Sequence, residues 1–164
     1  MNQSWKKGLT LATLLTAMAL YPWASASACD TYRFGTSGND TIYGDGTSDC
    51  IYGLEGDDKL YGAGNNDELY GDDGDDMLYG GNGYDYLDGW NGDDQLFGEA
   101  DGDTGLGYNG ADLVMGQSGS DSLYGEAGAD EIWGGNNPAS AYDYVDGGPD
   151  NDTCGEGEAT YNCP

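Results

Sequence analysis

A nine-residue period runs through most of this chain and restricts what it can fold into. From Gly35 to Trp133 the sequence divides into eleven consecutive units of nine residues, without a slip. A twelfth unit begins at Gly134 and carries four extra residues, and a thirteenth begins at Gly147. Because stacked copies of one short unit bury their apolar side chains against each other, the period predicts a solenoid.

Three positions within the unit have a fixed character. Position one is glycine throughout and position four is often glycine, which suits turns with positive φ. Position six is aspartate in all thirteen units: Asp40, Asp49, Asp58, Asp67, Asp76, Asp85, Asp94, Asp103, Asp112, Asp121, Asp130, Asp143 and Asp152. Position eight is apolar in nearly all: Ile42, Ile51, Leu60, Leu69, Leu78, Leu87, Leu96, Val114, Leu123, Ile132 and Val145. Each unit therefore predicts a six-residue turn followed by a three-residue strand with one inward side chain.

This unit resembles the nonapeptide G-G-x-G-x-D-x-U-x of the RTX (repeats-in-toxin) family, in which U is apolar. The resemblance covers residues 35 to about 155. It implies an all-β fold, a right-handed parallel β-roll of about thirteen nonapeptide units with two units in each coil, and so about six and a half coils. It also implies that multiple Ca²⁺ ions lie between the turns of successive coils, held by position-six carboxylates and backbone carbonyls. Units two apart, such as those of Asp40 and Asp58, would then be neighbours.

The charge of the chain also favours a cation as the partner. The sequence has 31 acidic and 4 basic residues, a net charge of −27, which disfavours nucleic acid and anionic membranes as partners. Ca²⁺ takes six to eight oxygen ligands, which carboxylates and turn carbonyls can supply. One ion for each pair of units two apart would give eleven sites. The alternative is that the position-six aspartates only shape the turn by accepting hydrogen bonds from backbone amides.

The core that this pattern predicts is thin, because each unit contributes one inward apolar side chain. Such a core offsets little of the entropy lost on folding, and the acidic residues repel each other. We therefore expect a chain that is disordered without calcium and rich in β-structure with it.

The first 28 residues have the features of a secretory signal peptide. They contain a basic pair at residues 6–7, an apolar run over residues 9–20 and small residues at 26–28. Cleavage is expected after Ala28, with Ala26 as the alternative. The sequence thus predicts a secreted, extracellular protein without a membrane span, with the periplasm as the alternative location.

The four cysteines, an even number, predict disulfides in an exported chain. One pair lies near each end, so we expect Cys29–Cys50 and Cys154–Cys163, with free thiols as the alternative. A lipoprotein with a lipidated Cys29 is disfavoured, because the residue three places before it is alanine. The expected organisation is a signal peptide (1–28), an N-terminal cap (29–34), the β-roll (35–155) and a C-terminal disulfide cap (156–164).

Position nine predicts what the outer faces of the two sheets present. If alternate units share a sheet, one sheet carries an outward apolar row: Tyr43, Tyr61, Tyr79, Phe97, Met115 and Trp133. The other sheet carries a broken row: Tyr52, Tyr70, Asp88, Leu106, Tyr124 and Asp146. The apolar row either stacks on itself from coil to coil or forms a binding surface for a protein, a glycan or a second copy.

Some positions depart from the pattern. The unit that begins at Gly98 has Gly105 at position eight, which predicts either a soft spot or a shift that brings Leu106 inside. The four inserted residues 138–141 predict a surface loop. Acids at position five are expected to be solvated charges at the edge: Asp57, Asp75 and Asp93.

The sequence as a whole predicts a secreted calcium-binding protein that is not an enzyme. It has no histidine, which excludes Ser-His-Asp and Cys-His catalysis and histidine zinc sites. The alternative function is an adhesion or surface-binding solenoid that calcium makes rigid and that binds through the aromatic row. An ice-binding version is disfavoured, because the row presents tyrosine where ranks of threonine would be expected.

Overall fold

The structure, a computed structural model, describes residues 29–135, 142–155 and 160–163. The expected signal peptide and the loop expected over residues 138–141 lie outside these ranges. The described residues form strands and turns, and no helix among them is long and apolar enough to cross a membrane.

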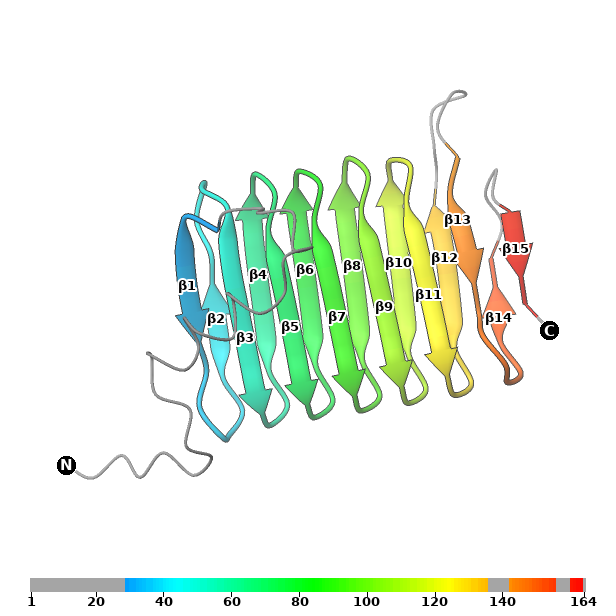
Figure 1. The fold of residues 1–164 in the computed structure, drawn as a ribbon, viewed down its shortest axis with the longest axis horizontal. Coiled ribbons are helices and arrows are strands. Elements are labelled where there is room, and N and C mark those ends of the chain that lie inside the picture. The colour runs from blue at the N-terminus through cyan, green and yellow to red at the C-terminus, as the bar shows by residue number, and fades with distance from the viewer. Residues whose placement is uncertain (1–28, 136–141, 156–159, 164) are drawn as a thin grey trace, which may run out of the picture.

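Two parallel sheets face each other along the length of the molecule, and successive strands alternate between them (Figure 1). One sheet has eight strands, in the order β1 (Thr31–Phe34), β3 (Asp49–Glu55), β5 (Glu68–Asp73), β7 (Tyr86–Asn91), β9 (Thr104–Asn109), β11 (Ser122–Ala127), β13 (Tyr144–Asp146) and β15 (Thr160–Asn162). The other has seven strands, in the order β14 (Thr153–Cys154), β12 (Glu131–Gly135), β10 (Leu113–Ser118), β8 (Gln95–Ala100), β6 (Met77–Asn82), β4 (Lys59–Gly64) and β2 (Thr41–Tyr43). The prediction of an all-β parallel roll is confirmed.

The strand register follows the nine-residue period. Paired residues in one sheet are two units apart, as in Leu60 opposite Leu78. After the four-residue insertion the pairing continues with Leu123 opposite Val145, so the extra residues leave the sheet in register. The coil count exceeds the expected six and a half and is about seven, because residues 31–34 and 160–162, outside the thirteen units, each add a strand.

The core is a double column of position-eight side chains between the two sheets. Ten of them are fully buried, with at most 1% of their surface exposed: Ile51, Leu60, Leu69, Leu78, Leu87, Leu96, Val114, Leu123, Ile132 and Val145. Ile42, in the strand at the end of its sheet, is packed against them but only partly buried. Burying one such side chain stabilises the fold by about 1.5–3 kcal/mol, and each unit of the core supplies only one of them.

Gly105 keeps the inward position of its unit, and the alternative of an inward shift of Leu106 is wrong. Gly105 pairs with Leu87 on one side and Leu123 on the other, while Leu106 stays half-buried on the outer face. The backbone hydrogen bonds of the sheet fix this register. A Cβ atom at Gly105 would lie 2.9 Å from Val114 Cγ1, so neighbouring side chains occupy the space that the missing side chain leaves.

The predicted apolar row runs down the outer face of the seven-stranded sheet. Rings of Tyr43, Tyr61, Tyr79 and Phe97 stack face to face, with 4.9 Å between successive centroids. Met115 continues the row in register. The row is therefore a ladder of rings that stabilise each other, and most of its members are half-buried.

Both predicted disulfides are present. Cys29 bonds to Cys50 with a Cα–Cα distance of 5.6 Å, and Cys154 bonds to Cys163 with 6.4 Å, both within the usual range. The first joins the segment before β1 to β3, and the second joins β14 to the residue that follows β15. Each bond thus fastens one end of the roll.

Candidate metal centre

The thirteen position-six aspartates form two rows, one along each edge of the roll where the chain turns between the sheets. One row contains Asp40, Asp58, Asp76, Asp94, Asp112, Asp130 and Asp152. The other contains Asp49, Asp67, Asp85, Asp103, Asp121 and Asp143. All except the terminal Asp40 and Asp152 are buried, with at most 3% of their surface exposed. The sequence prediction that units two apart are neighbours is confirmed.

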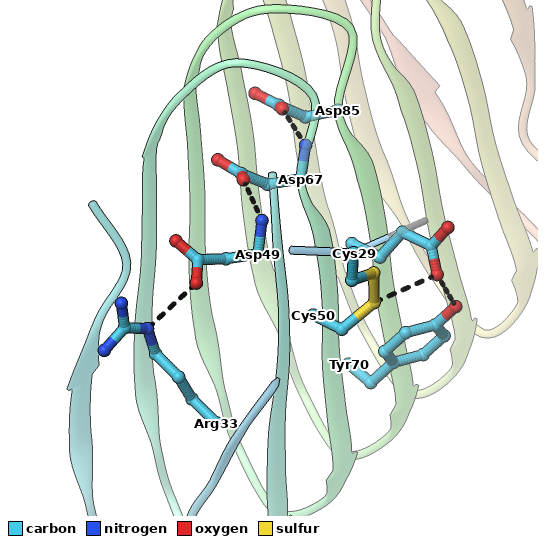
Figure 2. The surroundings of a disulfide bond; sticks show 8 residues. Cys29, Arg33, Asp49, Cys50, Asp67, Tyr70 and Asp85 are labelled. Atoms are coloured by element: carbon cyan, nitrogen blue, oxygen red, sulfur yellow. Dashed lines mark hydrogen bonds and ion pairs between the residues drawn. A yellow bond between two sulfur atoms is a disulfide. The ribbon is translucent and has the colours of Figure 1, made fainter. Parts of the chain in front are cut away.

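One carboxylate oxygen of these aspartates holds the coils together. The backbone N–H of Asp49 donates to Oδ1 of Asp67 at 2.7 Å, and that of Asp67 donates to Oδ1 of Asp85 at 2.8 Å (Figure 2). The same bond recurs between all successive members of both rows, at 2.7–3.1 Å. The aspartates therefore do shape the turn by accepting backbone amides, and in all but the first member of each row this role uses only Oδ1.

The second carboxylate oxygen is buried without a hydrogen-bond partner. In the described part of the chain this holds for Oδ2 of eleven position-six aspartates: Asp58, Asp67, Asp76, Asp85, Asp94, Asp103, Asp112, Asp121, Asp130, Asp143 and Asp152. A buried carboxylate oxygen that lacks a partner is costly unless a proton or a cation compensates it. The two rows thus present eleven such oxygens at regular intervals.

The position-one glycines make room for these oxygens. A Cβ atom at Gly62 would lie 2.5 Å from Asp67 Oδ2 and 2.6 Å from the carbonyl oxygen of Gly80. At Gly80 the corresponding distances are 2.5 Å to Asp85 Oδ2 and 2.9 Å to the carbonyl oxygen of Gly98. At each of these glycines, the Oδ2 atom of the aspartate in the same unit and a carbonyl oxygen of the next coil therefore lie where the Cβ atom of a larger residue would be.

The expectation that glycine supplies positive φ is confirmed at position four but not at position one. Gly74 and Gly92, both at position four, have φ of 143° and 139°. Position two also has positive φ, although most residues there are not glycine and only the second glycine of the family unit G-G-x-G-x-D-x-U-x indicates it: Leu54, Ala63, Asp72, Trp90, Glu99, Tyr108, Gln117 and Glu126. These residues adopt a left-handed conformation that costs about 1–2 kcal/mol each.

Burial raises the pKa of nine aspartates in the two rows: Asp58, Asp67, Asp76, Asp85, Asp94, Asp103, Asp112, Asp121 and Asp130. The pKa reaches about 8 for Asp94 and Asp103, and about 7 for Asp67 and Asp76. It reaches about 6 for three more: Asp85, Asp112 and Asp121. Loss of hydration is the main cause; the amide bond to Oδ1 opposes it and neighbouring carboxylates reinforce it. Such shifts are expected of buried anionic sites that require a compensating cation.

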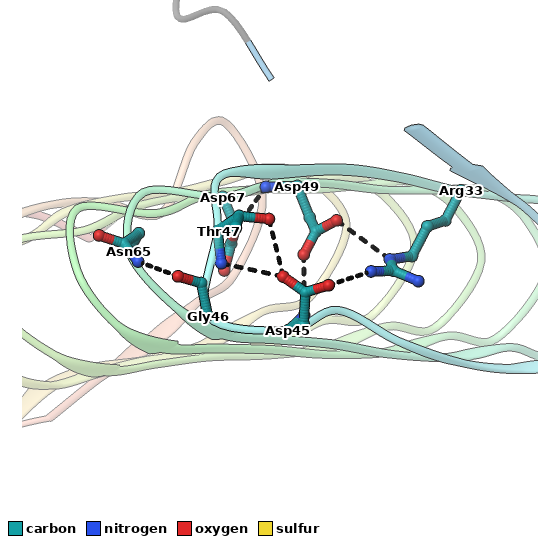
Figure 3. A network of polar contacts seen from close by, with 7 residues as sticks. All are labelled: Arg33, Asp45, Gly46, Thr47, Asp49, Asn65 and Asp67. Carbon is teal, nitrogen blue, oxygen red and sulfur yellow. Dashed lines mark hydrogen bonds and ion pairs between the residues drawn. The ribbon is translucent and has the colours of Figure 1, made fainter. Parts of the chain in front are cut away.

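The first aspartate of each row, Asp49 or Asp40, has hydrogen-bond partners that differ from those of the later members. Arg33 donates from Nε to Asp49 Oδ1 at 3.0 Å and from Nη2 to Asp45 Oδ2 at 2.8 Å (Figure 3). Oδ2 of Asp49 accepts the backbone N–H of Asp45 at 2.8 Å. In the other row, Oδ2 of Asp40 accepts the N–H and the hydroxyl of Thr36. Both of these first aspartates therefore have partners for Oδ2 that the following eleven lack.

The position-five acids Asp57, Asp75 and Asp93 are exposed, as predicted. They also accept hydrogen bonds from backbone N–H groups of the next coil. The N–H of Asp75 donates to Asp57 Oδ1, and the N–H of Asp93 donates to Asp75 Oδ1. Their role at the surface is thus partly structural, which their position in the unit did not reveal.

One further group of potential ligand atoms brings together both sulfurs of the Cys29–Cys50 bond and a carboxylate oxygen of Glu68, all within 4.8 Å of one another (Figure 2). Because the two sulfurs are bonded to each other, neither is a thiolate that could bind a metal. This group is therefore not a metal site.

Comparison with known proteins agrees with the geometry of the turns. The family model described as the RTX calcium-binding nonapeptide repeat matches residues 34–69, 70–104 and 106–137. The chain belongs to this calcium-binding repeat family. No curated protein and no solved structure matches the chain.

Proposed function

We propose that this chain is a secreted protein that binds several Ca²⁺ ions in its turns and folds as it binds them. The proposal rests on one observation above all, the eleven buried Oδ2 atoms without a hydrogen-bond partner. It is supported by the membership of the family and by the net charge of −27.

The donor atoms suit calcium. The candidate ligands are the carboxylates of the thirteen position-six aspartates, in particular the eleven with a partnerless Oδ2, together with carbonyl oxygens of the turns. These are hard oxygen donors, and the rows supply neither nitrogen nor sulfur. Ca²⁺ would supply positive charge between carboxylates that otherwise repel each other.

Coupling of folding to calcium follows from the balance of forces in the roll. The apolar core contributes one side chain per unit, whereas the rows bury one carboxylate per unit. At neutral pH the unfolded chain keeps these carboxylates ionised and hydrated, while the metal-free roll must strip them of water. A cation in the turns reverses this balance, so binding free energy becomes folding free energy.

A matched pair of variants tests the assignment of the ligands. Asp76→Asn removes a buried charge with a partnerless Oδ2, and Asp75→Asn removes an exposed charge one residue away. We expect Asp76→Asn to lower the number of bound Ca²⁺ ions measured by calorimetry, and Asp75→Asn to leave it unchanged. Equal numbers in both variants and the parent protein would contradict the assignment.

Secretion is supported by the two disulfides that fasten the ends of the roll. Disulfides persist in oxidising compartments, which agrees with the leader expected over residues 1–28. Expression of the full chain, with mass measurement of the mature product, tests this part. The expected product begins at Cys29, with a start at Ser27 as the alternative.

Adhesion through the aromatic row has less support. The rings of the row lie on one another, and among its members only Tyr43, in the strand at the end of its sheet, is a largely exposed ring, with 61% of its surface accessible. The row therefore has a structural role that needs no partner.

A further inference from the structure

The outer face of the eight-stranded sheet contains a cleft that the calcium sites do not explain. It has a volume of about 240 Å³ and is lined by Tyr70, Asp72, Asp88 and Trp90. Tyr70 and Asp72 come from β5 and lie opposite Asp88 and Trp90 of β7. Asp88 follows Leu87, which is buried in the core, so its side chain belongs to the opposite, outer face.

The cleft forms where a row of rings is interrupted by a carboxylate. Phe34, Tyr52 and Tyr70 stack with 5.1 and 4.8 Å between successive centroids. The next residue in register is Asp88 rather than another aromatic residue. Trp90, with 47% of its surface exposed, forms another wall and contacts Tyr108, with 5.4 Å between the ring centroids. The cleft thus combines aromatic walls with a carboxylate at the place of the missing ring.

The carboxylate of Asp88 is buried and only partly satisfied. Asp88 is 8% exposed, and its Oδ2 accepts a hydrogen bond from the Tyr86 hydroxyl at 3.2 Å. Its Oδ1 is buried and has no hydrogen-bond partner in the described part of the chain. A buried carboxylate oxygen in this state indicates a missing donor, preferably one that carries a positive charge.

The described part of the chain does not bring a basic side chain to this place. Of the two basic residues in the described ranges, Arg33 is bonded to Asp45 and Asp49, and Lys59 lies on β4 in the opposite sheet. Asp72 adds a second carboxylate to the lining. The lining is therefore anionic, without a compensating basic side chain among the described residues.

The chemistry of the lining selects the kind of cation. The carboxylates only accept hydrogen bonds, and the Tyr70 hydroxyl already donates to Glu68 at 3.0 Å. Ca²⁺ would need six to eight oxygen ligands, which two carboxylates beside aromatic rings do not provide. An alkylammonium group donates three hydrogen bonds and is attracted to the faces of aromatic rings.

We propose that the cleft between Tyr70, Asp72, Asp88 and Trp90 binds an alkylammonium group, supplied either by a small amine or by a lysine side chain of a partner. The volume fits such a group and is smaller than that of a drug-sized pocket. The site lies on the outer face of a sheet, whereas the candidate calcium ligands lie in the turns. The two assignments can therefore fail separately.

Calorimetry of the folded, calcium-saturated full chain with n-butylammonium chloride tests the site, with n-butanol as the uncharged control. We expect saturable binding of the amine and none of the alcohol. Asp88→Asn should weaken amine binding roughly 30-fold, as expected for loss of a buried charge partner. Asp146→Asn is the matched control and should leave binding unchanged. Asp146 also lies at position nine of the same sheet and also accepts a tyrosine hydroxyl, from Tyr144 at 3.2 Å.

A second variant keeps the test independent of folding. Trp90→Gly removes the aromatic wall, and glycine suits the φ of 78° at this position, so the backbone is not strained. It should weaken amine binding roughly 3- to 30-fold, the range of a cation–π contact. An unchanged calcium-dependent circular dichroism spectrum in both variants shows that they fold.

A lysine peptide, acetyl-Gly-Lys-Gly-amide, identifies the source of the ammonium group, and the same peptide with an acetylated lysine is its uncharged control. Stronger binding of acetyl-Gly-Lys-Gly-amide than of butylammonium indicates a protein partner, and weaker binding indicates a small amine; the acetyl-lysine peptide should not bind. Absence of amine binding would overturn the proposal. Equal binding by the parent protein and Asp88→Asn would also overturn it, as would a loss of one bound Ca²⁺ in Asp88→Asn without any effect on the amine.

Discussion

The metal-free roll should depend on pH in the direction opposite to that of most acidic proteins. The perturbation is removal of calcium, followed by titration of the metal-free protein. The pKa values of seven buried aspartates, among them Asp67 and Asp94, are raised to about 6 to 8, above the unfolded value of about 3.9. Protonation of such a group favours the folded state, so its contribution is fully present below about pH 4 and is lost as the pH rises through the folded pKa. The window here is about pH 4 to 8, because the folded pKa values lie at about 6 to 8.

The expected size of this effect is large compared with the stability of a domain. Each unit of pKa difference corresponds to about 1.4 kcal/mol. Between low pH and pH 7, a carboxylate with a folded pKa of about 7 or 8 lowers the free energy of unfolding by roughly 4 kcal/mol. A carboxylate with a folded pKa of about 6 lowers it by roughly 3 kcal/mol. Seven aspartates have values of about 6 to 8; neighbours in a row interact, so their losses do not simply add, but the loss at three of them alone is on the order of 10 kcal/mol. Typical domains are stable by about 5–15 kcal/mol, so the metal-free roll should not survive at neutral pH.

Circular dichroism of the metal-free protein between pH 8 and pH 5 measures this dependence, with sedimentation to exclude aggregation near the pI of about 4.1. We expect little β-structure at pH 8 and a gain of β-structure as the pH falls. Asp94→Asn should make the dependence shallower, whereas Asp93→Asn, with an exposed side chain, should leave it unchanged. A β-sheet signal that is constant over this range would refute the reasoning.

Four substitutions, one of them a control, test the packing of the calcium-loaded roll by chemical denaturation. Gly71→Ala places a Cβ against Asp76 Oδ2 and should cost about 2 kcal/mol or more, whereas Gly46→Ala, with no atom within 4 Å, should cost under about 0.5 kcal/mol. Ala63→Gly relieves a φ of 82° on an exposed residue and should stabilise by about 1 kcal/mol; a loss of stability would contradict the strain assigned to position two. Leu78→Ala should cost about 2–5 kcal/mol, and a cost near zero would show that the column of position-eight side chains is not the core.

The repeat made the architecture predictable. Its period fixed the strand register, because neighbouring strands come from units two apart. Position eight predicted the core, since an apolar residue in a fixed place of a short strand points the same way in every coil. The cysteine pairs were predictable because each pair lies close together in sequence near one end of the chain.

Other features depend on contacts between coils and were not predictable. Positive φ at position two is imposed by the turn on residues as different as Leu54 and Trp90, so only the second glycine of the family unit, and not the residue types of this chain, indicates it. The position-one glycine serves close approach of the position-six carboxylate, which appears only once the coil is closed. Arg33 lies outside the thirteen units, yet it caps one row of aspartates through Asp49. The single Gly105 did not indicate whether the strand would keep its register with glycine in the core, or shift so that Leu106 points inward.

The central claim is that calcium in the turns is part of the fold, and one measurement tests it most directly. Circular dichroism of the full chain at pH 7.5 would be recorded in excess EGTA and then during a calcium titration, with magnesium as the control. The claim predicts a disordered spectrum in EGTA and a cooperative gain of β-structure as several Ca²⁺ ions bind, with no such gain in magnesium. A β-sheet spectrum in EGTA that calcium leaves unchanged would contradict it.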